Sequence, residues 1–423
     1  MRDPLIQTQL RRRPHGRPTR WPASGRRAIT TVMGVILFVS GCGAVSTDRG
    51  VGPVQHAAGS HFRALEPEWR YRGTVGGRTT TLVAYRGGAA ISQGWVAFIE
   101  VPFTPEANRL TCLDLESGRV LWQRRVADDV RCVAFGSQLL VVTSEQRGSA
   151  STIDLEVVDA TSGRHMAAVR LAVADAASSA VATLDAAYVS TRDGKMICVD
   201  AASHSVLWQE QLAPDEQAHG LLFAGDRNVF IVTPRKLRAL SRSDRRLWES
   251  NAPELLGCDP LLTESLQDRL VIAGHDAVAA LDATTGRLLW KRAVRGPLRQ
   301  TGISAEQGVY LAATEGSLLA MSLHDGHALW EQTLSSVGPP SGLTSLTTAG
   351  GHVFLYPMEA DRDWYLHAFT LSQGKDVLRD PDPFVVGLRI MSQGTNVVAP
   401  DFDEIRGYDV AKLGSDIGSP ARR

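Results

Sequence analysis

The amino-acid sequence predicts an all-β protein, an eight-bladed β-propeller whose blades are four-stranded antiparallel sheets. Three observations lead to this prediction. A unit of about forty residues recurs along the chain, as in other repeat architectures. Each unit contains four short apolar runs separated by turns, which is typical of propeller blades. The two chain ends supply complementary parts of one further unit, so N- and C-terminal strands are expected to close the ring together.

The repeat is marked by a turn, usually with Gly, and then an apolar run containing Trp, as in "LDATTGRLLW" (281–290). Two degenerate copies carry Ala167 and Leu378 at this position, which we call the Trp slot. Successive slots are 45, 41, 40, 42, 40 and 48 residues apart. In chain order the slots are Trp122, Ala167, Trp208, Trp248, Trp290, Trp330 and Leu378.

The copy that contains Trp330 shows how one unit divides into strands. Its four runs are "TGISAE", "GVYLAAT", "SLLAMSL" and "HALWEQTL", and the breaks between them contain Gly. Short apolar runs between such turns predict hairpins, and none is long enough for an amphipathic helix. The Ala-rich stretch around 174–190 falls, by repeat register, on the first two strands of the unit that ends at Trp208.

The chain ends predict how the ring closes. Residues 66–75, "EPEWRYRGTV", read as an outer strand with Trp69 but have no inner strands before them. Residues 384–411 read as three strands without an outer strand. Joining them gives an eighth blade and removes a free sheet edge. A seven-bladed ring is the alternative, and it requires that one degenerate copy be discarded.

The residues of the repeat have a structural interpretation. The carboxylate of Asp282 can accept hydrogen bonds from turn amides, Gly286 can adopt positive φ, and Trp290 can fill the gap between neighbouring sheets. We therefore predict that the recurring Trp residues are wedges between blades rather than a cofactor platform. The other residues assigned to this structural repeat are Trp69, Trp122, Trp208, Trp248, Trp330, Gly118 and Gly326.

The N-terminal region predicts export. Residues 1–41 hold eight Arg and one acidic residue, and they include a short apolar run at 28–39. The run ends in "VSGC", where Val39, Ser40, Gly41 and Cys42 resemble a bacterial lipobox. This resemblance implies cleavage before Cys42, lipidation of its thiol and an anchor on the outer face of the cell membrane, or on an outer membrane if the host has one. An uncleaved anchor helix is the alternative. The predicted organisation is a signal peptide at 1–41, a flexible tether at 42–60, a propeller at 61–411 and a flexible tail at 412–423.

The repeat units also carry a family resemblance. "ALDATTGRLLW", "CVDAASHSVLW" and "CLDLESGRVLW" resemble the pyrrolo-quinoline-quinone-type propeller repeat over roughly residues 61–411. Such repeats occur in quinoprotein dehydrogenases, in BamB-type lipoproteins of the outer-membrane β-barrel assembly machine, and in extracellular sensor domains of bacterial kinases. The resemblance implies a fold but leaves these functions open.

A BamB-like role is the function we favour from the sequence. Many alcohol-oxidising relatives hold the quinone between a Trp and a disulfide of adjacent cysteines, beside calcium, and no adjacent cysteines occur here. A C-x-x-C-H haem motif is also absent, and the breaks between strands are mostly short. We expect a monomeric, non-enzymatic propeller without cofactor or metal that binds an envelope protein. A quinone-dependent dehydrogenase and an extracytoplasmic ligand sensor are the alternatives.

The remaining candidate residues are interpreted as structural or solvent-exposed rather than functional. Without residues 1–41 the chain has 37 basic and 44 acidic residues, which argues against a nucleic-acid partner. Cys112, Cys132, Cys198 and Cys258 form no metal or redox motif and are expected to be free, buried thiols, although their pairing stays open. We expect His324 and His327 on a solvated turn. The acidic stretches 379–384 and 401–405 are expected to be solvated, with calcium or a basic partner as alternatives.

Overall fold

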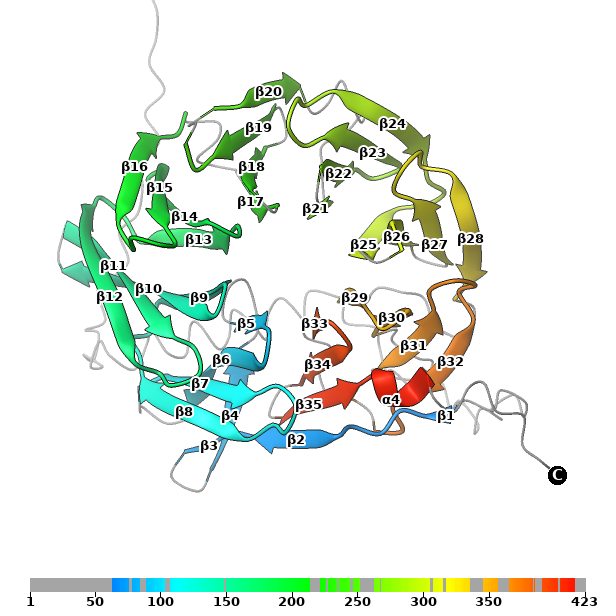
Figure 1. Ribbon diagram of the computed structural model, residues 1–423, viewed down its shortest axis with the longest axis horizontal. Coiled ribbons are helices and arrows are strands. Elements are labelled where there is room, and N and C mark those ends of the chain that lie inside the picture. The colour runs from blue at the N-terminus through cyan, green and yellow to red at the C-terminus, as the bar shows by residue number, and fades with distance from the viewer. Residues whose placement is uncertain are drawn as a thin grey trace, which may run out of the picture. The chain divides into compact units, whose positions relative to one another are not determined.

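Eight four-stranded units form a ring in the computed structural model (Figure 1). The structure describes residues 63–414 except 76–77, 84–88, 103–106, 148–149, 214–220, 226, 234–235, 244–245, 252–261, 267, 305–306, 315–316, 335–344, 357–364, 383, 385–389 and 402–403. The first strands of all neighbouring blades contact one another, including those of blades 8 and 1. The predicted eight-bladed, all-β propeller is confirmed, and the seven-bladed alternative is wrong.

Blades 1 to 7 each take four consecutive antiparallel strands, with the first strand innermost (Figure 1). Blades 1 to 4 are β5 (Ala89–Ser92), β6 (Trp95–Pro102), β7 (Arg109–Asp114) and β8 (Val120–Arg125); β9 (Val130–Phe135), β10 (Gln138–Arg147), β11 (Ala150–Asp159) and β12 (His165–Val173); β13 (Ala177–Ala182), β14 (Ala186–Thr191), β15 (Lys195–Asp200) and β16 (Val206–Gln211); and β17 (Leu221–Ala224), β18 (Asn228–Val232), β19 (Lys236–Ser241) and β20 (Trp248–Asn251). Blades 5 to 7 are β21 (Leu262–Leu266), β22 (Arg269–Ala273), β23 (Ala277–Asp282) and β24 (Leu288–Ala293); β25 (Leu298–Ser304), β26 (Val309–Thr314), β27 (Ser317–Ser322) and β28 (Ala328–Thr333); and β29 (Leu346–Ala349), β30 (His352–Leu355), β31 (His367–Thr370) and β32 (Asp376–Arg379). The Ala-rich stretch forms β13 and β14, as predicted.

Blade 8 is assembled from both ends of the propeller sequence. Its inner strands are β33 (Met391–Gln393), β34 (Asn396–Pro400) and β35 (Glu404–Asp409), and its outer strand is β2 (Trp69–Arg72). β2 pairs antiparallel with β35, and Trp69 lies opposite Gly407. The predicted closure by N- and C-terminal strands is therefore confirmed.

Three features add to the predicted blades. β1 (Arg63–Ala64) pairs in parallel with β32 on the outer edge of blade 7. β3 (Thr74–Val75) and β4 (Arg78–Val83) form a hairpin that extends blade 1 through pairing of β4 with β6. A single turn of helix, α4 (Ala411–Gly414), follows β35. None of these was predicted, because the repeat pattern has no counterpart of them.

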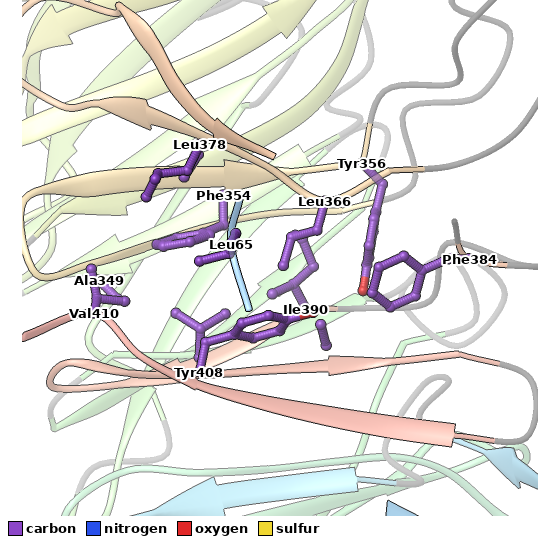
Figure 2. Close-up of a cluster of buried hydrophobic side chains, with 13 residues drawn as sticks. Leu65, Ala349, Phe354, Tyr356, Leu366, Leu378, Phe384, Ile390, Tyr408 and Val410 are labelled. Carbon is purple, nitrogen blue, oxygen red and sulfur yellow. The ribbon is translucent and has the colours of Figure 1, made fainter. Parts of the chain in front are cut away.

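The hydrophobic core lies between neighbouring blades. The middle strands are buried on both faces; all six residues of β14 and of β26 are buried, for example. Each sheet is covered by a sheet on either side, so both faces of its middle strands are apolar. Figure 2 shows this between blades 7 and 8, where Leu65, just after β1, packs among Phe354, Leu378 and Tyr408.

Each Trp in a slot binds the following blade. Its indole N–H donates to a backbone carbonyl in the turn between the third and fourth strands of that blade, at 2.7 to 3.0 Å. The donor and acceptor pairs are Trp69–Leu115, Trp122–Ala160, Trp208–Arg242, Trp248–Ala283, Trp290–Leu323 and Trp330–Leu371. At five of the six junctions the ring also lies against the Gly of that turn: Gly118, Gly163, Gly286, Gly326 and Gly374.

The residue that pairs with the slot on the third strand is matched in size to it. A Trp always lies opposite a small residue: Cys112, Cys198, Ala239, Ala280, Ala320 or Gly407. Where the slot holds Ala167, the opposite residue is the larger Val157. In the next blade, His204 replaces the turn Gly and keeps positive φ (54°), the sole non-Gly residue in the described part of the chain to do so. Without a Trp ring at this junction, a Cβ is tolerated.

We predict that Gly286→Ala destabilises the propeller far more than Gly296→Ala. Both glycines have positive φ (71° and 79°), so both substitutions incur the left-handed backbone cost of about 1–2 kcal/mol. A Cβ at Gly286 would lie 2.6 Å from the Trp248 ring, whereas nothing lies within 4 Å of one at Gly296. Overpacking should therefore lower the free energy of unfolding of Gly286→Ala by a further 1–3 kcal/mol or so. Urea unfolding followed by Trp fluorescence measures both, and equal losses would contradict the wedge.

Candidate functional site

The predicted lipobox lies outside the described residues. This holds for Val39, Ser40, Gly41 and Cys42, for the tether, and for Cys258. Among the residues that the structure describes, no helix is long and apolar enough to cross a membrane. Lipidation at Cys42 therefore stays a prediction from the sequence.

A quinone with calcium does not fit the side chains in the described part of the propeller. Each Trp of the repeat already donates its indole N–H to the next blade, and its ring packs between blades. The described residues include no group of three or more His, Cys, Asp or Glu side chains placed to hold a metal ion. We derive no chemistry from such a group.

The three described cysteines are buried, free thiols. Burial raises the pKa of the Cys112, Cys132 and Cys198 thiols to about 12. Cys112 and Cys198 occupy the small position opposite a Trp slot. Because the thiolate is the reactive form, these residues are packing elements rather than nucleophiles.

The short turns use their polar side chains internally. The Asp282 carboxylate accepts hydrogen bonds from the backbone N–H groups of Thr284 and Thr285, which lowers its pKa. His324 and His327 are exposed on the equivalent turn of blade 6, where the backbone N–H of His327 donates to Asp325. Local hydrogen bonds therefore hold the side chains of these turns, and the described residues of the turns form no cluster of metal-ligating side chains.

The outer strand β2 carries a polar clasp that closes the ring. Its side chains alternate, so Arg70 and Arg72 point to one side of the strand and Trp69 and Tyr71 to the other. Arg70 Nη1 and Arg72 Nε bind the Glu404 carboxylate at 3.1 and 2.6 Å. The Tyr71 hydroxyl donates to Glu100 of blade 1 at 2.6 Å. The two arginines thus hold β2 against β35 within blade 8, while Tyr71 and Trp69 join it to blade 1.

Behind β2 lies a buried ion network. Arg406 Nε binds Glu404 at 2.8 Å, and Arg406 Nη1 binds Asp380 at 3.1 Å. The Tyr408 hydroxyl also donates to Asp380, and the Arg406 guanidinium lies 4.0 Å from the centre of the Phe384 ring. Asp380 is fully buried and Glu404 is 2% exposed. The expectation that the acids at 379–384 and 401–405 are solvated is wrong for these residues, because Arg406 draws both carboxylates into the junction between blades 7 and 8.

The electrostatics of Glu404 follow from this network. Burial by itself would raise the pKa of its carboxyl, but hydrogen bonds from Arg406 and Arg72 and the positive charges of Arg406 and Arg70 lower the pKa below its ordinary value. Glu404 is therefore charged in the folded protein at neutral pH. Its carboxylate forms ion pairs with the guanidinium groups of Arg70, Arg72 and Arg406.

The clasp belongs to a repeating layer of contacts that our sequence analysis missed. We call two facing residues of neighbouring blades a junction pair. The first residue lies two positions after a Trp slot. The second lies on the third strand of the next blade, one position before the residue that pairs with the Trp slot of that blade. Asp380 and Arg406 are the junction pair of blades 7 and 8. The same register gives Arg124–Glu156, with N–O distances of 2.7 and 2.8 Å, and Glu210–Arg238. Reading the repeat at these two positions would have singled out Asp380 and Arg406.

The outer wall of the ring is the candidate interaction surface. We define it as the fourth strands β8, β12, β16, β20, β24, β28, β32 and β2. Five of the six large hydrophobic side chains that are exposed in the described part of the chain lie on it, at 37–51% exposure: Val120, Met166, Leu207, Leu288 and Leu329. The sixth, Leu184, lies in the turn between β13 and β14 at 74% exposure. The outer strands thus expose aliphatic side chains on the surface of the ring.

Comparison with known proteins identifies related sequences. The model of the family described as outer membrane protein assembly factor BamB matches residues 63–218, 152–255 and 235–375. A protein of that name from Nitrosomonas eutropha is 27% identical over 167 residues, which are 38% of this chain and 39% of the relative. Another from Burkholderia pseudomallei is 27% identical over 252 residues, 55% of this chain and 62% of the relative. The chain therefore spans less than two thirds of the length of each of these relatives.

Solved structures resemble the fold. The crystal structure of BamB from Moraxella catarrhalis superimposes with a TM-score of 0.56 at 16% identity, covering 82% of this chain and all of that one. The computationally designed Ika8 protein gives a TM-score of 0.58 at 11% identity, covering 78% and 96%. Sqt1 of Saccharomyces cerevisiae gives 0.55 at 10% identity, covering 78% and 98%. At these identities the likeness concerns the propeller fold alone.

We predict that Glu404→Gln destabilises the protein at neutral pH and much less in acid. Removing one partner from a buried ion pair costs about 3 kcal/mol or more. Because the folded-state pKa of Glu404 is depressed, its stabilisation is present above the ordinary pKa of 4.5 and is lost as the pH falls through the folded-state pKa. The difference in free energy of unfolding between wild type and Glu404→Gln should therefore shrink below about pH 4.5.

Urea unfolding over this pH range measures the difference. The control is Asp154→Asn, which breaks the exposed pair with Arg170 and should cost less than about 1 kcal/mol. A wild-type advantage that stays constant down to low pH would contradict the role of the Glu404 carboxylate.

Proposed function

Since this chain belongs to the family of outer membrane protein assembly factor BamB, we propose that it is a non-enzymatic, lipid-anchored scaffold of the cell envelope that binds a protein partner during outer membrane protein assembly. The observation that carries the proposal is the family match, which runs from residue 63 to residue 375 and so covers most of the ring. The named activity of its relatives is the source of the assembly role.

The architecture supports a scaffold. The Trp wedges hold one blade against the next, and the Arg406–Asp380 ion pair does so between blades 7 and 8, which favours a rigid ring. Rigid elements position a binding surface without an ordering cost at the moment of association. The exposed aliphatic side chains of the outer wall provide apolar contacts of the kind that anchor protein interfaces.

The proposed anchor sets where the ring works. Lipidation of Cys42 with several acyl chains would give stable attachment to a membrane. Residues 43–62 then separate the lipid from β1 and can span at most about 70 Å when extended. The propeller would thus remain near the membrane while its outer wall is free to meet a partner.

We predict that deletion of the gene in its own host lowers the abundance of outer membrane β-barrel proteins. The reason is that a scaffold of their assembly would be missing. Quantitative mass spectrometry of outer membrane fractions measures the loss, and expression of the wild-type protein should restore the normal levels. Cys42→Ser, which removes the lipidated thiol, should restore them incompletely, and the variant should no longer incorporate labelled palmitate.

Two outcomes would overturn this function. Unchanged outer membrane proteins in the deletion strain would remove the assembly role. Dye reduction by the purified protein that depends on added pyrrolo-quinoline quinone and calcium would favour a dehydrogenase instead.

A further inference from the structure

The junction pairs follow a simple rule at seven of the eight junctions. Charge meets opposite charge in Arg124–Glu156, Glu210–Arg238 and Asp380–Arg406. Tyr71 binds Glu100 beside Thr111, and Gln332 occupies the register position that faces His367. The remaining two pairs are uncharged, namely Val169–Ile197 and Ser250–Ala279. At none of these seven junctions does a charged side chain face an apolar one.

The junction between blades 5 and 6 breaks the rule. Arg292 on β24 occupies the position of Arg124, but the position of Glu156 is taken by Leu319, which is 7% exposed. The Arg292 guanidinium donates from Nη1 to the backbone carbonyl of Gly326 at 3.1 Å. It makes no ion pair with any residue in the described part of the chain. A half-buried guanidinium that meets an aliphatic side chain lacks the carboxylate that its counterpart in blade 1 holds with two bonds.

A pocket occupies the place of the missing carboxylate. It has a volume of about 240 Å³ and is lined by Arg292, Arg295, Ser317, Leu319 and Glu331, among others. Arg295 and Glu331 are exposed, and the formal charges of Arg292, Arg295 and Glu331 together give +1. Guanidinium groups bind carboxylates in a bidentate manner, whereas the Ser317 hydroxyl already shares a hydrogen bond with the Thr314 hydroxyl at 3.0 Å. The single net positive charge suits a singly charged carboxylate better than a doubly charged phosphate.

We propose that this pocket receives an acidic side chain of a protein partner, whose carboxylate takes the place at Arg292 that Glu156 takes at Arg124. The partner is the one required by the proposed function, so the inference rests on that function. Leu329, which is half exposed, follows the pocket-lining residue Ala328 on β28 and offers the partner an apolar contact beside the charge. The outer wall of blades 5 and 6 is thereby the docking region.

The test uses two labelled peptides that differ only in the central residue of Leu-Glu-Leu and Leu-Gln-Leu, with fluorescence polarisation as the readout. We expect the wild-type protein to bind the Glu peptide about tenfold more tightly than the Gln peptide, as for one charge-assisted hydrogen-bonded pair. Arg292→Met should abolish this preference. Absence of a preference in the wild type, or its persistence in Arg292→Met, overturns the proposal.

Leu319→Glu provides an independent variant. It places an internal carboxylate where blade 2 has Glu156, so it should pair with Arg292, exclude the Glu peptide and unfold at a higher urea concentration than Leu319→Gln. Leu319→Gln should keep the preference for Glu, because its amide carries no charge. If inorganic phosphate displaces the Glu peptide at lower concentration than acetate does, the site takes phosphate and the proposal is wrong.

Complementation of the deletion strain separates this proposal from the proposed function. If the pocket docks the partner, Arg292→Met and Leu319→Glu should both fail to restore outer membrane protein levels although the proteins are folded and abundant. Full restoration by both variants would contradict the proposed docking at the pocket but not the proposed assembly function. A deletion strain without any change overturns the assembly function, while the peptide measurements still decide whether the pocket binds a carboxylate.

Discussion

The propeller depends on one repeated contact, the indole that bridges two blades. At five of the six Trp junctions the ring lies against the Gly of a turn in the next blade, and at all six the N–H donates to a carbonyl of that turn. A buried indole without a hydrogen-bond partner would be costly, so the contact fixes both the position and the orientation of the next blade. The small residue opposite each Trp, the Gly of the following turn and the forty-residue period are all consequences of this geometry.

Closure of the ring needs more than this contact, because β2 comes from the other end of the propeller sequence. Arg70 and Glu404 are 334 residues apart, and bringing them together costs chain entropy that no local turn reduces. A buried ion pair adds little net stability over apolar packing, but a wrong partner leaves charges uncompensated in the interior. The network of Arg70, Arg72, Glu404 and Arg406 therefore selects β2, in one register, as the strand that completes blade 8.

The sequence allowed the number of blades, the strand order and the mode of closure to be predicted, because these depend on turn chemistry that recurs within forty residues. Asp282, Gly286 and Trp290 can be recognised without any tertiary information. β1 and the clasp could not be found in this way, since they arise from pairing between distant segments, and the β3–β4 hairpin was missed because it has no counterpart in the repeat. The junction pairs were also missed, because the charges exchange places from Arg–Glu to Glu–Arg and so leave no constant residue to align.

Some blades depart from the residue pattern of the repeat. These departures differ in whether neighbouring residues change with them so that the contact between blades is kept. At the junction of blades 2 and 3 the Trp is lost, but Val157 fills the space, Val169 and Ile197 pack together, and His204 takes the turn position that a ring would exclude. Such a change is neutral for the ring. At the junction of blades 5 and 6, Leu319 takes the place of a carboxylate partner, and no described residue forms an ion pair with Arg292. Arg292 keeps one bond across the junction, to the Gly326 carbonyl, but not the two-bonded carboxylate that Arg124 holds, and this difference is the reason to propose an acidic partner from outside the ring.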